Sequence, residues 1–302
     1  ARLADDDRPL TVDDLIVNEG SPFAVFTVGG REGQYVQLNL TAQTATAGHD
    51  YENTLEYWDG QEWAVYGPGT FVQVPKNTND ISNEAAHLLV RVAIKPDSFL
   101  DTGETFTLTA TNTGGTRATG QATIMDDGTG TIFLTQNDDP TTLADEMIAG
   151  VSADGIALSN VNTPKDDDRP LSVNDVTVNE GSPYLVFTVS GYEGQPITLQ
   201  LTSGTAVLAQ DTASDLEYFD GVAWQPYTAG DSLALPNNGN ATAGERVDLL
   251  VRLAVKQDVF YEMAESFTLQ AIVLEGKSAI GSGTILDDGT GTLWNFTPPN
   301  PL

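Results

Sequence analysis

Hydrophobic and polar residues alternate along several short segments of the chain. Residues 36–41, 88–95 and 105–110 each place apolar side chains at every second position. Successive side chains of a strand point to opposite faces of its sheet, so a period of two with one apolar face is typical of a half-buried antiparallel strand. The pattern therefore predicts short strands rather than helices along most of the sequence.

The chain contains a long internal repeat. Residues 5–10 return as residues 166–171, and the same offset of 161 relates residues 17–22 to residues 178–183. A repeat of this length corresponds to a whole domain, because the units of solenoids and propellers are far shorter. The chain is therefore two copies of one module in tandem.

The repeat also sets the expected boundaries. We predict a first module over residues 5–135 and a second module over residues 166–297. Residues 136–165 are expected to form a linker, since they contain loop-forming Asn, Asp and Pro residues. A short helix is possible within this linker at residues 142–148.

Each module is predicted to contain about seven to eight strands. Asp59-Gly60 and Asp220-Gly221 lie between aromatic residues and indicate hairpin turns. Short alternating strands separated by turns are typical of a two-sheet sandwich. The predicted fold class is all-β, with two tandem immunoglobulin-like β-sandwich domains. The absence of cysteine excludes the Cys-Trp-Cys pattern of antibody domains and any disulfide staple.

The charge of the chain restricts its partners. Of 302 residues, 43 are Asp or Glu and 13 are Lys or Arg, which gives a net charge of −30. Nucleic-acid binding requires clustered basic residues, and anionic lipid surfaces attract them, so we expect no nucleic-acid partner and no direct membrane insertion. Cations and basic surfaces are the favoured partners.

Many of the carboxylates lie where predicted strands begin or end. Asp101 is replaced by Glu262 in the second copy, and the other members keep their identity between the two copies. The first copy contains Glu19, Asp50, Asp97, Asp101, Glu104, Asp126 and Asp127, and the second contains Glu180, Asp211, Asp258, Glu262, Glu265, Asp287 and Asp288.

The order of these motifs resembles the Calx-beta domain over nearly all of each module. The matching segments are Glu19-Gly20, residues 46–51, residues 97–106 and residues 124–127. The resemblance implies a Calx-beta-like sandwich that binds Ca²⁺ at one end through the fourteen carboxylates given above. The second copy departs from the family pattern at residues 207–208 and at Thr212, which weakens the case for Asp211. Glycine replaces the last Asp of the closing acidic run in both copies, so fewer ions are expected.

The physical chemistry of calcium is consistent with this resemblance. Calcium binds six to eight hard oxygen ligands, mostly carboxylates and carbonyls. Two carboxylates about 4 Å apart repel each other by about 1 kcal/mol in water and about 4 kcal/mol at an intermediate dielectric. The alternative is that these residues are solvated acidic loops of a very acidic protein. Residues 5–7 and 166–168, three Asp each, either complete a site between modules or keep the linker soluble.

A larger resemblance is to the tandem extender repeats of giant bacterial RTX adhesins. It is carried by the segments at residues 5–10, 17–22 and 126–131 and by their second copies. It implies a calcium-rigidified stalk segment at the extracellular bacterial cell surface, with a role in cell adhesion and biofilm. The expected partners are neighbouring repeats of the same chain and calcium ions, and we expect the chain to be a piece of a longer protein.

Two other functions compete with a structural role. The first is an adhesive module that recognises a glycan or a protein through aromatic residues, namely Trp58, Trp63, Tyr66, Phe219, Trp224 and Tyr227. Packing within the sandwich is the simpler interpretation of these side chains. The second is a lyase or hydrolase on a β-sandwich scaffold. We expect no enzyme, because His49 and His87 are not shared by the two copies and no nucleophile or nucleotide motif occurs.

Overall fold

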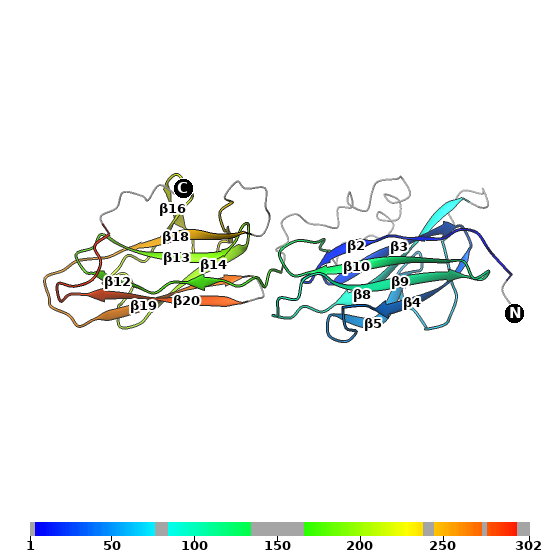
Figure 1. Ribbon diagram of the computed structural model, residues 1–302, viewed down its shortest axis with the longest axis horizontal. Helices are drawn as coiled ribbons and strands as arrows, with labels where there is room; N and C mark the ends of the chain where they lie inside the picture. The colour runs from blue at the N-terminus through cyan, green and yellow to red at the C-terminus, as the bar shows by residue number, and fades with distance from the viewer. Residues whose placement is uncertain (1–3, 76–83, 134–165, 238–244, 274–276, 295–302) are drawn as a thin grey trace. The chain divides into compact units, whose positions relative to one another are not determined.

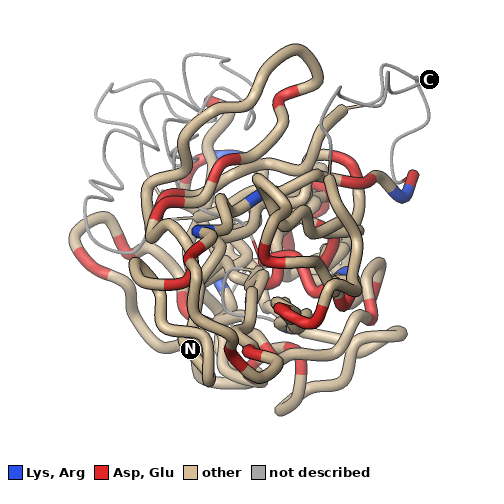
Figure 2. Tube along the Cα trace, turned by 90° about the vertical axis from the view of Figure 1, so that its left-hand side faces the viewer, with Lys and Arg blue, Asp and Glu red and all other residues tan. Residues whose placement is uncertain are grey.

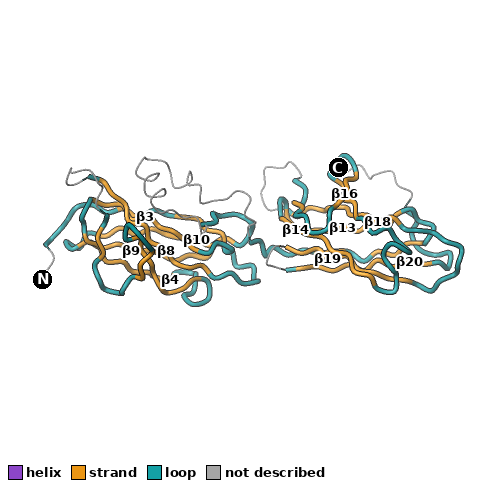
Figure 3. The backbone as a smooth tube through the Cα atoms, turned by 180° about the vertical axis from the view of Figure 1, so that it is seen from behind, coloured by secondary structure: helices purple, strands orange, loops and turns teal. Residues whose placement is uncertain are grey.

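The computed structural model of the protein contains two compact units, Ala1–Asp166 and Asp167–Leu302. The residues that it describes are 4–75, 84–133, 166–237, 245–273 and 277–294. Within these ranges all regular secondary structure is strand, and no helix is present (Figure 3). The all-β prediction is therefore confirmed. The possible helix at residues 142–148 lies outside the described residues, and the predicted linker boundaries stay a prediction.

The first unit is a sandwich of two five-stranded sheets (Figure 1). One sheet has the strand order β1-β3-β8-β5-β6 and the other has the order β2-β10-β9-β4-β7. The strands of the unit are β1 (Thr11–Val12), β2 (Leu15–Asn18), β3 (Phe23–Arg31), β4 (Tyr35–Ala42), β5 (Tyr51–Trp58), β6 (Trp63–Val65), β7 (Val72–Gln73), β8 (Ala85–Ile94), β9 (Glu104–Asn112) and β10 (Arg117–Met125).

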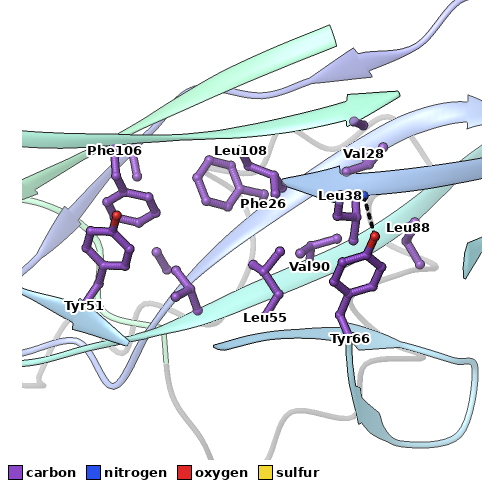
Figure 4. Close-up of a cluster of buried hydrophobic side chains, with 14 of the residues drawn as sticks. Phe26, Val28, Leu38, Tyr51, Leu55, Tyr66, Leu88, Val90, Phe106 and Leu108 are labelled. Carbon is purple, nitrogen blue, oxygen red and sulfur yellow. Dashed lines mark hydrogen bonds between the residues drawn. The ribbon is translucent and has the colours of Figure 1, made fainter. Parts of the chain in front are cut away.

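The core of the first unit lies between these two sheets (Figure 4). The alternating segments predicted from the sequence place their apolar residues inward along β4, β8 and β9. The ring of Tyr51 stacks on that of Phe106 with centroids 4.3 Å apart, and Phe26 meets Phe106 edge-on at 5.9 Å. The Tyr66 hydroxyl accepts a hydrogen bond from the backbone N–H of Leu38 at 3.0 Å. Aromatic packing thus ties both sheets together without a disulfide.

The second unit repeats this architecture with its own core. Its sheets have the orders β11-β13-β18-β15-β16 and β12-β20-β19-β14-β17. Its strands are β11 (Ser172–Val173), β12 (Val176–Asn179), β13 (Tyr184–Tyr192), β14 (Pro196–Ser203), β15 (Leu216–Phe219), β16 (Trp224–Tyr227), β17 (Leu233–Ala234), β18 (Arg246–Ala254), β19 (Glu265–Val273) and β20 (Ser278–Leu286). The prediction of two β-sandwich domains is confirmed.

Each unit has ten strands in its described part, more than the seven to eight that the sequence pattern predicts. The additional ones are pairs of residues such as β1 and β7, which are too short to show a period of two. The predicted hairpin at Asp59-Gly60 joins β5 to β6. The Asp59 carboxylate accepts the backbone N–H groups of Gln61 and Glu62 at 2.8 and 2.9 Å, and Gly60 has a φ of +101° that favours glycine.

Candidate metal centre

Strand pairing brings several acidic residues of the first unit to one end of the sandwich. β2 and β10 run parallel with Asn18 opposite Met125, so both strands end at the same edge. Glu19 and Asp126 are the residues that follow them, and the Glu19 N–H donates to the Met125 carbonyl at 2.8 Å. The topology alone therefore sets these two carboxylates side by side.

Neighbouring strands add further carboxylates at this end. Glu104 opens β9 and lies opposite Ile124 near the end of β10. Asp50 precedes β5, and its carboxylate accepts the backbone N–H of Thr46 at 2.5 Å, which fixes the loop before the strand. Acidic positions also outnumber basic ones along the described chain as a whole (Figure 2). One cation near this edge, Lys95, donates to the Gly48 carbonyl at 2.8 Å and lies 3.3 Å from the Glu52 carboxylate.

Two groups of carboxylates form in the first unit. One oxygen from each of Glu19, Asp126 and Asp166 lies within 4.8 Å of the others. Asp50, Asp101 and Glu104 form a second group with the same spacing. Like charges this close repel one another unless a proton or a cation lies among them.

Glu19 is the most constrained member of the first group. Its side chain is 3% exposed, and Asp126 is 0% exposed. Its Oε1 accepts the backbone N–H of Asp97 at 3.2 Å, whereas its Oε2 is buried and has no hydrogen-bond partner among the described residues. Burial, followed by the charge of Asp126, raises the pKa of Glu19 to about 8. In the absence of a cation this carboxyl therefore holds a proton near neutral pH.

The second group shows the same electrostatic pattern at a more exposed position. Burial, with a hydrogen bond to Asp50 and the negative charges around it, raises the pKa of Glu104 to about 7. Such shifts arise where carboxylates share one small volume, because each negative charge opposes the next.

The second unit gathers an equivalent group at the same end of its sandwich. Oxygens of Asp211, Glu262 and Glu265 lie within 4.8 Å of one another. Burial and the charge of Asp211 raise the pKa of Glu265 to about 7. The structure thus brings Asp211 into a carboxylate group even though its surrounding sequence departs from the Calx-beta pattern.

Glu180 and Asp287 of the second unit correspond to Glu19 and Asp126. Burial raises the pKa of Glu180, and the neighbouring charges of Asp287 and Asp258 act in the same direction. The Asp287 carboxylate also accepts the backbone N–H of Glu262 at 3.1 Å. This pair therefore lies beside the group formed by Asp211, Glu262 and Glu265, and it is less deeply buried than its counterpart.

Four of the predicted ligands have local hydrogen bonds that stabilise their own loops. Asp97 and Asp258 accept the backbone N–H two residues ahead, at 2.7 and 2.6 Å. Asp127 and Asp288 accept the backbone N–H of the threonine two residues ahead, at 3.1 and 2.9 Å, and also its hydroxyl. The structure does not bring these four residues into the carboxylate groups.

Asp166 belongs to a group although the sequence left its role open. Its backbone is hydrogen-bonded to Asn18 and Gly128 at the end of the first unit, and its carboxylate meets Glu19 and Asp126. The sequence could raise this contact only as one of two alternatives, because Asp166 and Asn18 are 148 positions apart in the chain. The donor chemistry of all three groups is oxygen alone, which fits calcium rather than a transition metal.

The aromatic residues of the first unit mainly pack within the sandwich. Trp58 and Tyr66 are buried, and Trp63 lies edge-on to Trp58 with centroids 5.8 Å apart. The Arg91 guanidinium lies 4.3 Å from the Trp63 ring and 2.7 Å from the Glu56 carboxylate. Phe219, Trp224 and Arg252 repeat this arrangement in the second unit. These contacts favour packing over an open aromatic binding face.

No protein-family model and no curated protein matches the chain. Among solved structures, the apo form of the Calx CBD1 domain is 17% identical, covers 39% of this chain and 97% of its own, and has a TM-score of 0.26. The CupB6 tip adhesin from Pseudomonas aeruginosa is 10% identical over 92% of this chain and 98% of its own, with a TM-score of 0.26. Three cadherin domains (EC1-3) of mouse clustered PcdhgC3 are 11% identical over 93% of this chain and 68% of their own, with a TM-score of 0.34. Scores this low do not indicate the function of this chain.

The described residues contain no helix of the length and apolar character that crossing a membrane requires.

Proposed function

We propose that the chain is a calcium-stabilised structural segment of a large bacterial surface adhesin, which holds a distal ligand-binding domain away from the cell. The observation that carries this proposal is the Glu19 carboxylate. It is buried beside Asp126 and Asp166, one of its oxygens has no hydrogen-bond partner among the described residues, and its pKa is raised to about 8. A divalent cation would satisfy that oxygen and remove the repulsion.

Three groups of residues are proposed to hold calcium. Each supplies three carboxylates, and bidentate binding, backbone carbonyls and water can complete the six to eight oxygens that the ion requires. The groups are Glu19, Asp126 and Asp166; Asp50, Asp101 and Glu104; and Asp211, Glu262 and Glu265.

The proposed role of the ion is mechanical. Glu19 and Asp126 follow β2 and β10, and Glu104 of the other group opens β9, so this end of the sandwich contains two groups of carboxylates that repel one another. An ion in each group would join strand ends as a disulfide does in exported domains, and this chain contains no cysteine. Extracellular modules function with calcium sites of about 10⁻⁴–10⁻³ M affinity, which suits a surface location.

Calorimetry of the full chain tests the proposal. We expect about 10 mM calcium to raise the melting temperature above that in EDTA, since a ligand at 100 times a Kd of about 10⁻⁴ M stabilises the folded state by about 2.7 kcal/mol. Sodium chloride at the same ionic strength is the control, because it screens solvated acidic loops without binding the groups. Equal melting temperatures in calcium and in EDTA would contradict the proposal. An effect that sodium chloride reproduces would instead favour solvated acidic loops.

A further inference from the structure

In the first unit, the Asn18 side chain and the Gly128 N–H form hydrogen bonds to the backbone of Asp166. We call these two residues the clamp. Its Oδ1 accepts the N–H of Asp166 at 2.9 Å, and its Nδ2 donates to the carbonyl of the same residue at 3.0 Å. The N–H of Gly128 donates to that carbonyl as well, also at 3.0 Å. One residue of an extended segment thus has both of its backbone groups bound, as it would be beside a strand.

The clamp is held in place by its own unit. The Asn18 amide also donates to the carbonyl of Thr129 at 2.8 Å and accepts the N–H of Gly20 at 3.1 Å. Gly20 leaves room for the bound segment, because a Cβ there would lie 3.1 Å from the Cβ of Asp166. The contact is therefore a preformed site.

The second unit has the same clamp. Asn179 donates to the carbonyl of Thr290 at 2.8 Å and accepts the N–H of Gly181 at 2.9 Å, so its amide has the orientation of Asn18. Gly289 has a φ of +78°, and its counterpart Gly128 has a φ of +77°. Among the described residues, no backbone segment occupies the position in the second unit that Asp166 occupies in the first. Both of these hydrogen bonds of Asn179 are exposed to solvent.

A segment that matches this clamp occurs elsewhere in the chain. Residues 5–9 and residues 166–170 have the same sequence, so Asp5 corresponds to Asp166. The next residues also share their structure, because Arg8 binds Asp6 as Arg169 binds Asp167, at 2.7 and 2.6 Å. In the described part of the chain, neither backbone group of Asp5 has a hydrogen bond.

We propose that the end of the second unit at Asn179 and Gly289 binds the backbone of an Asp-Asp-Asp-Arg-Pro segment, and that residues 4–9 of a second copy of this chain fit it. The interface is heterologous, because the clamp and the segment are different surfaces of one molecule, so repeated binding extends a chain of molecules. Three backbone hydrogen bonds give weak binding between separate chains. A covalent connection strengthens it by raising the effective concentration.

Peptide titration of the isotopically labelled full chain, followed by NMR, tests the proposal. The probe is a peptide of residues 3–10, Leu-Ala-Asp-Asp-Asp-Arg-Pro-Leu. We expect saturable shifts at the side-chain amide of Asn179 and the N–H of Gly289. The signals of Asn18 and Gly128 serve as an internal control, since Asp166 already occupies that clamp and these signals should not move.

Two substitutions, one in the peptide and one in the protein, distinguish binding at the clamp from nonspecific binding of the peptide. A peptide with Asp5→Pro lacks the N–H that Asn179 Oδ1 would accept, and the Asn179→Asp protein keeps the bond from Gly181 but lacks the amide donor. Either change should weaken binding at least several-fold. Absence of saturable shifts, equal shifts at Asn18 and Gly128, or full binding of the Asp5→Pro peptide would overturn the proposal. The proposed backbone contacts involve no calcium ion. Titrations in calcium and in EDTA therefore test peptide binding separately from the proposed calcium function.

Discussion

At the scale of single residues, burial of Glu19 is costly without a counter-charge. A carboxylate that is nearly inaccessible to solvent and lies next to Asp126 and Asp166 is stable only if a proton or a cation neutralises it. Under the proposed function, a proton and calcium compete for the same oxygens, and this competition determines how each substitution and each pH should act.

Replacing Glu19 with Gln should have opposite effects on the melting temperature in EDTA and in calcium. In EDTA near pH 8 the variant removes a buried like charge and should melt at a higher temperature than the native chain. In calcium it removes a ligand and should melt lower. A change of about 1 kcal/mol corresponds to about 2–4 °C for a unit of this size, which calorimetry resolves. Glu62→Gln, on the exposed hairpin between β5 and β6, removes the same charge and is the matched control. A shift of the same sign in both conditions would contradict this account.

The calcium-free protein should lose stability as pH rises from about 4.5 to 8. The pKa values of Glu19, Glu104 and Glu265 are raised in the folded state from 4.5 to about 8, 7 and 7. The folded state therefore binds more protons than the unfolded state across this interval, and each deprotonation lowers the free energy of unfolding. Melting temperatures measured in EDTA at several pH values test this. Saturating calcium should flatten or reverse the trend, because deprotonation strengthens ion binding.

At the scale of elements, the long strands could be predicted because their core-facing residues alternate. β4, β8 and β9 show the expected period of two, and their apolar faces form the core. The two-residue strands could not be predicted, since so short a pair carries no period. The parallel pairing of β2 with β10 also has no local signal, because it joins residues about a hundred positions apart.

The same distinction applies to the candidate site. Carboxylates at strand ends are visible in the sequence, and Glu19 and Asp126 come together because β2 and β10 end at the same edge. Asp127 looks identical to Asp126 in the sequence, but one step along an extended chain turns its side chain to the other face. There it accepts the N–H of Thr129. Choosing between adjacent acidic residues therefore required the three-dimensional arrangement.

The Tyr66 hydroxyl should contribute measurably to stability by joining β4 to the loop after β6. It accepts the N–H of Leu38 at 3.0 Å and donates to the carbonyl of Thr70 at 2.8 Å. Tyr66→Phe leaves that buried N–H unsatisfied, which should cost about 1–3 kcal/mol in urea denaturation. Tyr35→Phe is the control, since the Tyr35 hydroxyl has no hydrogen bond among the described residues. A loss in Tyr66→Phe no greater than in the control would contradict this role.

At the scale of the whole molecule, two units with separate cores contain the same fold but differ in how they enclose their carboxylates. In the first unit Glu19 and Asp126 are buried and Asp166 lies against them, whereas Glu180 and Asp287 of the second unit are partly exposed. Exposed charges are better screened by water, so their mutual repulsion is weaker. The two units should therefore depend on calcium to different degrees.

Calcium should raise the melting temperature of the first unit more than that of the second. Asp126→Asn should reduce the calcium-dependent shift of the first unit, because it removes a carboxylate from one of its two groups, and the matched Asp287→Asn should have a smaller effect on the second unit. Because the units have separate cores, we expect calorimetry of the full chain to show one transition for each unit, which NMR signals from Tyr51 and Thr212 assign. Tyr51 stacks on Phe106 next to the first carboxylate groups, while Thr212 occupies the equivalent buried position in the second unit. Equal shifts of both units, or a larger loss in Asp287→Asn, would show that burial of the carboxylates does not determine how strongly each unit relies on the ion.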